Sequence, residues 1–259
     1  MSVAATDVAA TDRFEYVLRL ADDSLILSHR VAEWTSWAPQ IEEDLALVNI
    51  GLDLLGQARN LLSYAGEIEG EGRSEDDLAF LRQEREFLNV VLVEQPTLHE
   101  FAKLIAVLFY YSAYSVPLFK LLSSSPDTTL AEIAAKSLKE VRYHLEHAAG
   151  WVLRLGDGTE FSHERMQEAI DEYWPIAGDL FEADALVERL ASQGVVPHPS
   201  VMRSAWEATV SEVLDEATLS KPERGFRSGA GRIGLHSEHL GYILAEMQYT
   251  HRLHPGAQW

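Results

Sequence analysis

Three side chains near the middle of the sequence have the types and the spacing to bind a metal ion. Glu140, His144 and His147 stand at positions i, i+4 and i+7, so on an α-helix they lie on one face, while Glu146 points away from them. A metal site in this chain must use carboxylates and imidazoles, because the chain has no cysteine. The same three residues could equally be ordinary polar residues between helices. Without a matching set of ligands elsewhere, this second interpretation is favoured.

A second polar cluster opens the last predicted helix. His236, Glu238 and His239 stand close together, and Glu246 and Met247 follow on the same helix. Histidine titrates near neutral pH, so the cluster could bind a metal ion or relay a proton. Residues at a helix start also serve as caps and form hydrogen bonds between subunits. We expect this structural or partner-contact role rather than catalysis.

A di-iron site in a helical bundle requires more than either cluster provides. It takes one glutamate from each of two helices and a Glu-x-x-His pair from each of two others. The one pair with this spacing, Glu160 and His163, spans a turn and a helix start, so it cannot point both groups at a bundle axis. In the long second helix, Asp53 has the shorter carboxylate and Gly56 takes the place of histidine. The sequence therefore predicts no complete metal site, no bound cofactor and no catalytic residue in this chain.

Composition narrows the classes of function. The 259 residues include 41 acidic and 21 basic side chains, a formal net charge of -20, which disfavours binding to nucleic acid and to anionic membranes. The lack of cysteine excludes iron–sulfur clusters, thiolate zinc sites and cysteine nucleophiles, and no nucleophile elbow, phosphate loop or dinucleotide fingerprint occurs. Arg224, Arg227 and Arg232 form a local basic exception. They could contact a phosphate or an acidic patch of a partner, although a solvated loop is the simpler interpretation.

Helical periodicity covers nearly the whole chain, which predicts an all-α fold. Two long helices are expected over 12–37 and 41–68. Along the second, apolar residues recur at helical spacing at Leu45, Val48, Leu52, Leu55 and Leu62. Further helices are expected over 75–94, 101–122, 128–156, 162–192 with a kink at Pro175, 200–219 and 235–253. Long helices joined by short loops are typical of a ferritin-like bundle, here with additional C-terminal helices.

We expect one domain over 12–259, preceded by a disordered lead-in over 1–11. The lead-in lacks the basic start and apolar run of a signal peptide, so a cytoplasmic protein is expected. The most apolar stretch, 104–122, is interrupted by Ser112, Ser115, Pro117 and Lys120. It falls short of the roughly 18 to 20 uninterrupted apolar residues of a membrane span, and we predict a buried core helix.

Five segments resemble the C subunit of the bacterial phenylacetyl-CoA epoxidase complex. They are Asp44–Asn60, Val93–Pro96, Gly234–Gly241, Leu244–Tyr249 and the ending Pro255–Trp259. The resemblance extends over nearly the whole chain beyond roughly the first dozen residues. In that family the C subunit is structural and holds no iron pair. The resemblance implies a partner, the catalytic A subunit, whose di-iron centre epoxidises the aromatic ring of phenylacetyl-CoA during aerobic phenylacetate catabolism.

The same resemblance implies further partners and a shared surface. A reductase subunit passes electrons from NADPH to the catalytic subunit, which also uses O₂. Two related bundles packed face to face require an extended, partly apolar surface of at least about 1,000 Å². Coenzyme A is polyanionic, so an acidic chain is expected to leave its binding to the partner. Two alternatives stay open: a homodimer when the chain is isolated, and a self-sufficient metal-binding oxidase that uses Glu140, His144 and His147.

Overall fold

The computed structural model describes residues 3–257, and their side chains from residue 10 onward. Within this range the chain is helical and has no strand. The α-helices are α1 (Val3–Ala32), α2 (Ile41–Glu69), α3 (Glu75–Phe80), α4 (Phe101–Leu122), α5 (Thr128–Gly156), α6 (Glu160–Ala177), α7 (Ala185–Ser192), α8 (Pro199–Glu216) and α9 (Glu238–Leu253). Short 3₁₀ turns lie at Glu84–Glu86, Val91–Glu94, Gly178–Phe181 and Gly231–Ile233. The predicted all-α class is confirmed.

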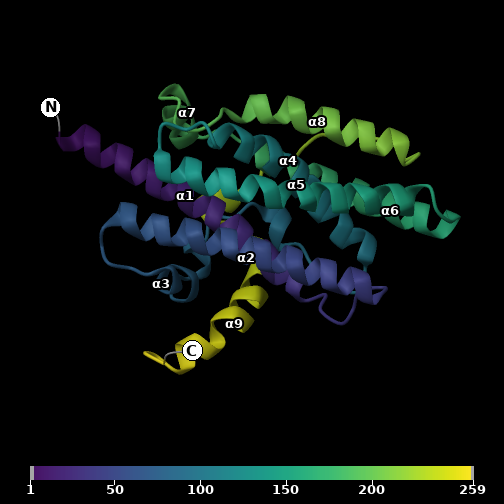
Figure 1. The fold of residues 1–259 in the computed structure, drawn as a ribbon, viewed down its shortest axis with the longest axis horizontal. Coiled ribbons are helices and arrows are strands. Elements are labelled where there is room, and N and C mark those ends of the chain that lie inside the picture. The colour runs from purple at the N-terminus through teal and green to yellow at the C-terminus, as the bar shows by residue number, and fades with distance from the viewer. Residues whose placement is uncertain (1–2, 258–259) are drawn as a thin grey trace.

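The four long helices form the bundle that positions everything else. α1 packs along α2, α4 packs along α5, and α2 contacts α5 (Figure 1). α6 and α8 pack against α4, and α7 packs against α1. α9 projects from the body of the bundle below α2 in this view (Figure 1). This is the ferritin-like bundle with additional C-terminal helices that the sequence predicts.

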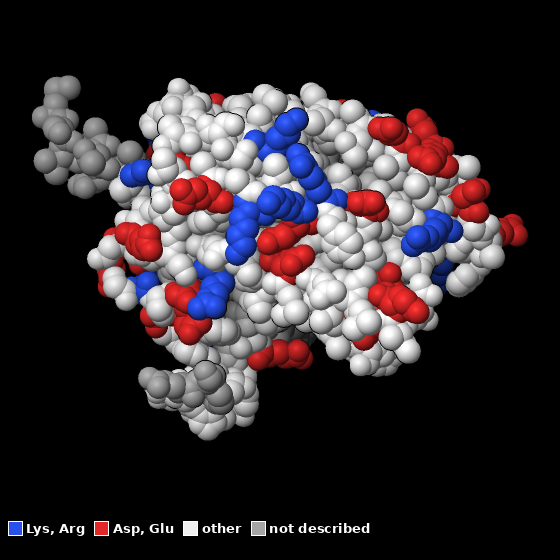
Figure 2. Space-filling model, viewed as in Figure 1, with Lys and Arg blue, Asp and Glu red and all other residues white. Residues whose placement is uncertain are grey.

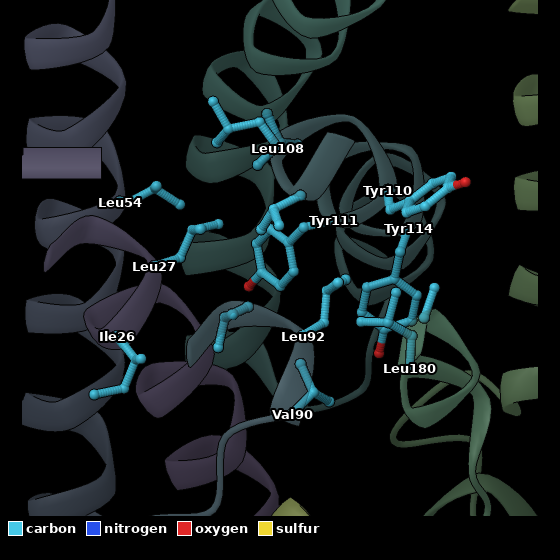
Figure 3. Packing of buried hydrophobic residues seen from close by; sticks show 14 of the residues in the cluster. Ile26, Leu27, Leu54, Val90, Leu92, Leu108, Tyr110, Tyr111, Tyr114 and Leu180 are labelled. Atoms are coloured by element: carbon cyan, nitrogen blue, oxygen red, sulfur yellow. The ribbon is translucent and has the colours of Figure 1, made fainter. Parts of the chain in front are cut away.

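Apolar side chains fill the space between the long helices. Leu27 of α1, Leu54 of α2, and Leu108 and Tyr111 of α4 lie in this space and are buried (Figure 3). Burying a leucine side chain contributes roughly 1.5–3 kcal/mol relative to leaving it exposed. The inward positions of the bundle are therefore held by apolar groups, and their packing stabilises the fold.

α4 is the central core helix. By length and hydropathy it could cross a membrane, and it is the one helix with this property among the described residues. In the bundle, however, 78% of its most apolar window is buried. The predicted core helix is thus confirmed.

Several helix ends agree with the sequence because local capping decides them. α2, α4 and α5 match the predicted ranges to within one residue. The side chain of Asp127 caps α5 by accepting a hydrogen bond from the Leu130 backbone N–H at 3.1 Å. Gly70 ends α2 with a φ of 72°, a left-handed conformation that favours glycine.

The predicted disordered lead-in over 1–11 differs from the structure. α1 begins at Val3 and continues to Ala32, so residues 3–11 are helical, while residues 1 and 2 lie outside the described residues. Alanine is the strongest helix former, and the stretch contains Ala4, Ala5, Ala9 and Ala10. Its small residues therefore extend the first helix.

The predicted helix over 75–94 is wrong beyond its first turns. α3 ends at Phe80, and the chain then follows an irregular path with two short 3₁₀ turns. Buried carboxylates accept backbone N–H groups along this path. The hydrogen bonds are Leu88 to Asp22, Val90 to Asp23 and Val91 to Asp179, each at 2.8 Å. These acceptors replace the carbonyl groups of a preceding helical turn, so a continuous helix is not formed.

The predicted sixth helix over 162–192 is two helices in the structure. α6 ends at Ala177, and Pro175 in its last turn has no N–H to donate. The Pro175 carbonyl accepts a hydrogen bond from the Arg227 backbone N–H at 2.8 Å, in place of a further helical turn. α7 is a separate helix capped by Asp184, which accepts from the Val187 N–H at 2.9 Å.

Candidate functional site

The candidate site lies where α2 and α5 face each other, and three polar pairs join the two helices there. The pairs are Glu43 with His147 at 2.7 Å, Asp53 with His144 at 3.1 Å and Gln57 with Glu140 at 2.9 Å. Trp151 adds a fourth contact by donating its indole N–H to Glu43 at 2.7 Å. Together these contacts fasten α2 to α5 along one line.

Glu140, His144 and His147 share one face of α5, as their spacing predicts, but they do not meet at one point. Their partners are spread along α2, where Glu43 and Asp53 stand ten positions apart, about 15 Å along the helix. Among the described residues, no three histidine, aspartate or glutamate side chains are grouped so that they could hold a metal ion. The geometry supports pairwise contacts between helices.

Burial sets the charge of the central pair. The His144 side chain is almost fully buried, and this burial lowers its pKa below the ordinary value, although the hydrogen bond and charge of Asp53 oppose the shift. At neutral pH His144 is therefore a neutral imidazole that donates its Nε2–H to Asp53. Such a pair holds two helices together without adding positive charge to the interior.

The position interpreted as a lost histidine, Gly56, does not face the interior. A side chain at Gly56 would meet no atom within 4 Å, so this position faces open surface. The buried neighbour is Leu54, and Asp53 is turned toward α5. Apolar residues at the inward positions, rather than Gly56, account for the incomplete ligand set. Glu160 and His163 both stand in the first turn of α6, which begins at Glu160, two residues before the predicted start at 162.

The outer side of α2 exposes a line of large apolar side chains. Ile41, Leu45, Leu52 and Leu55 are 77%, 60%, 60% and 45% exposed, and Trp37, just before the helix, is 57% exposed. We call these five residues the α2 ridge. The four ridge residues that lie within α2 are spaced so that they form one stripe along the helix. Contiguous exposed apolar groups of this kind mark interaction sites.

Sequence reasoning missed this ridge, because Leu45, Leu52 and Leu55 were expected to belong to one apolar pattern with the rest of the helix. α2 has a separate buried stripe, formed by Leu47, Ile50, Leu54 and Leu61. The signal that could have revealed the ridge is an apolar pattern on two sides of one helix, since a surface helix normally has one apolar face. Such a pattern indicates a helix that is covered on both sides.

His236 of the second cluster lies in the interior. Its Nδ1 is 3.0 Å from a carboxylate oxygen of Glu94, and its Nε2 is 2.8 Å from the Phe87 carbonyl. Both neighbours only accept hydrogen bonds, so both ring nitrogens carry protons. Burial lowers the pKa of His236, but the hydrogen bond and charge of Glu94 outweigh it and raise the pKa above the ordinary value. The structure therefore gives His236 the role of a buried structural cation, and contact of this residue with a partner stays a prediction.

Arg232 is internal as well. Its guanidinium donates to Asp23 at 2.8 and 3.0 Å and to the Leu88 carbonyl at 3.0 Å. Burial raises the pKa of the Asp23 carboxyl to about 6, against the opposing effect of Arg232. The loop before α9 is thus fixed to α1 by an ion pair, and contact of Arg232 with a partner stays a prediction.

The remaining predicted contact residues lie at the surface. Arg224, Arg227 and Glu238 are exposed, and His239 is partly exposed. The Arg224 carbonyl accepts the Trp174 indole N–H at 2.9 Å, so the backbone of this loop is held against α6. Contact of these four side chains with a partner stays a prediction.

Comparison with known proteins agrees with the fold and with the segments that carry the resemblance. The family model described as phenylacetic acid catabolic protein matches residues 2–259. The chain is also similar to an Escherichia coli (strain K12) protein, the C subunit of 1,2-phenylacetyl-CoA epoxidase. The two are 52% identical over 245 residues, which cover 94% of this chain and 98% of the relative. The chain therefore belongs to the family of phenylacetic acid catabolic proteins.

Proposed function

We propose that this chain is a structural, non-catalytic subunit of a phenylacetyl-CoA epoxidase. In this role it pairs with the catalytic A subunit in the cytoplasm and stabilises it. The di-iron centre, the aromatic substrate and O₂ belong to that partner, which receives electrons from NADPH through a reductase subunit. The similarity to the C subunit of such an epoxidase supports this role.

The observation that carries the proposal is the apolar interior of the bundle. A di-iron centre of this fold needs four carboxylates and two histidines that project inward. Inward positions of α1, α2 and α4 are instead taken by Leu27, Leu54 and Leu108 (Figure 3). In the described part of the chain, the residues do not fit a di-iron centre. The chain contributes shape and surface to the complex.

The alternative, a self-sufficient oxidase built on Glu140, His144 and His147, receives less support from the geometry. Each of the three side chains contacts a different residue of α2, so one ion could be bound only by breaking these pairs. The pairs have a structural role instead, because they hold α2 and its exposed ridge in place.

The test compares the isolated chain with the chain co-expressed with its catalytic partner. Iron is quantified by mass spectrometry, and assembly is followed by size-exclusion chromatography. We expect an iron-free isolated chain, and a co-eluting complex in which the catalytic subunit holds iron and is more soluble than when it is expressed alone. A tightly bound iron pair in the isolated chain would contradict the proposal, and so would separate elution of the two chains.

A further inference from the structure

A band of positive charge lies beside the α2 ridge. Lys136, Lys139 and Arg142 on α5 are exposed, and Arg59, 74% exposed, lies on α2. We call these four residues the basic band. Figure 2 shows a string of blue side chains across the middle of one face of the molecule, with red side chains directly beside it.

The cations of the band are largely unneutralised, although the chain as a whole has a net charge of -20. Within the described residues, Lys136, Lys139 and Arg142 have no ion pair and no side-chain hydrogen bond. Arg59 contacts Glu75 at 3.3 Å, and exposed pairs of this kind contribute only about 0–1 kcal/mol. The band therefore has charge available for a partner.

Acidic side chains accompany the band but make no ion pair with its α5 cations in the described structure. Glu140 and Asp53 keep their negative charge, because Gln57 and His144 are neutral, but both carboxylates accept hydrogen bonds within the contact between α2 and α5. Glu132 and Glu146 are exposed one helical turn before Lys136 and one turn after Arg142. The band is therefore a set of unpaired cations on a face of mixed charge, and these cations are accessible to carboxylates of a partner.

Tyr143 connects the basic band to the polar pairs. It is 45% exposed and follows Arg142 on α5, and its ring centroid lies 6.0 Å from that of His147. Tyrosine presents an apolar body and a polar tip, which makes it frequent at protein interfaces. The face thus changes from apolar on α2, through an aromatic residue, to basic on α5.

We infer that the α2 ridge and the basic band form one docking surface, and that its occupant is a protein face with an apolar strip beside a row of carboxylates. The inference rests on the proposed function, because it assigns this complementary face to the catalytic subunit. α2 has 29 residues, so it is roughly 40 Å long. This length suits a standard interface, which buries about 800 Å² on each partner.

The two parts of the surface have different tasks. Burial of the ridge contributes most of the affinity, because the hydrophobic effect scales with the apolar area removed from water. Exposed charges at the rim mainly speed association and exclude partners of the wrong charge. The basic band therefore selects an acidic partner and orients it, and the ridge holds it.

A second copy of this chain fits the surface less well. In a symmetric dimer the same patch lies on both sides of the interface. Two sets of unneutralised cations would then be brought toward each other, which is unfavourable. A partner that supplies carboxylates at this place forms ion pairs instead.

The test uses two matched double charge reversals. Lys139→Glu with Arg142→Glu alters the band, and Arg224→Glu with Arg227→Glu makes the same charge change in the exposed loop before α9. Each variant is co-expressed with a tagged catalytic subunit, and the fraction retained on the immobilised tag is measured as NaCl is raised. We expect retention of the band variant to fall about ten-fold at low salt, and the loop variant to behave like the unchanged chain.

A third variant, Leu52→Asp, tests the ridge and is expected to abolish retention, because docking would bury an unpaired charge. Thermal unfolding of each isolated variant shows whether its fold is intact. If the unchanged chain is retained and the band and ridge variants are retained equally well, the docking surface is wrong while the proposed function stands. If only the loop variant fails to be retained on the immobilised catalytic subunit, the contact between the two chains lies in the loop before α9, and the docking surface is wrong. If the unchanged chain is not retained, or if it forms a dimer that Leu52→Asp dissociates, the partner assigned to this surface is wrong.

Discussion

At the scale of single residues, buried charges determine the path of the chain. Asp22 and Asp23 are adjacent on α1, and each meets an arginine from a distant segment. Arg82 donates two hydrogen bonds to Asp22, and Arg232 donates two to Asp23. The same carboxylates accept backbone N–H groups of the segment 81–97. These contacts fix two irregular segments whose regular structure, among the described residues, consists of short 3₁₀ turns.

Replacing Arg82 tests this interpretation. Arg82→Met is expected to lower the free energy of unfolding by about 3 to 5 kcal/mol, because it leaves the Asp22 carboxylate buried without its cation. Arg59→Met serves as the control, since Arg59 is exposed and its loss should change the stability by less than about 1 kcal/mol. Urea denaturation measures both. If Arg82→Met lowers the free energy of unfolding no more than Arg59→Met does, the structural role of the Arg82–Asp22 pair is refuted.

His236 should make stability depend on pH. Glu94 raises the pKa of His236 in spite of its burial, so the folded state holds the proton more tightly than the unfolded state. This contribution to the free energy of unfolding is fully present below the unfolded pKa of about 6.5 and is lost as the pH rises through the higher folded pKa. His236→Gln should therefore destabilise more at about pH 6 than at about pH 8.5. If denaturant unfolding shows that His236→Gln lowers the free energy of unfolding equally at the two pH values, the buried imidazolium is contradicted.

At the scale of elements, sequence periodicity predicted the long helices well and the irregular segments poorly. α4 and α5 have the predicted bounds because their apolar patterns are long and because a local signal separates them: Asp127 caps the start of α5. The segment 81–97 keeps a helical pattern in sequence, but its path is set by Asp22, Asp23 and Asp179, which are distant along the chain. Periodicity contains no information about such acceptors.

The candidate site was predictable only in part, because local spacing is visible in the sequence and contacts with distant segments are not. Spacing placed Glu140, His144 and His147 on one face of α5, and the structure agrees. Their partners, including Glu43, lie about 80 to 105 positions earlier in the chain, beyond the reach of local pattern. The exposure of the α2 ridge was not predictable from one helix alone, because it depends on which side the rest of the bundle covers.

Two glycines of α2 give a matched test of the fold. Gly56→Ala is expected to raise the free energy of unfolding by about 0.5–1 kcal/mol, because the position is open and alanine is the better helix former. Gly66→Ala is expected to lower it by about 1–3 kcal/mol, because the added methyl group would collide with the Arg73 carbonyl. Denaturant unfolding of both variants provides the measurement. Destabilisation by Gly56→Ala would show that this side of α2 is covered in the isolated chain.

At the scale of the whole molecule, the architecture suits a protein that acts through its surface. Apolar side chains fill most of the interior of the bundle (Figure 3). The buried carboxylates of Asp22 and Asp23 are paired with arginines, and the polar pairs between α2 and α5 join helices instead of gathering around a point. The α2 ridge and the basic band are exposed outside this interior. In the proposed function, this ferritin-like bundle supports a related bundle that carries the chemistry.

The most direct test of this account removes the ligand-type side chains from the assembled complex. The triple variant Glu140→Gln, His144→Gln and His147→Gln keeps hydrogen-bonding groups at the α2–α5 contact but removes the ligand types that would bind iron. After co-purification with the catalytic subunit, iron content and phenylacetyl-CoA epoxidation are measured together. The account predicts that both equal those of the unchanged complex. Loss of iron and activity from a variant complex that still assembles would contradict it.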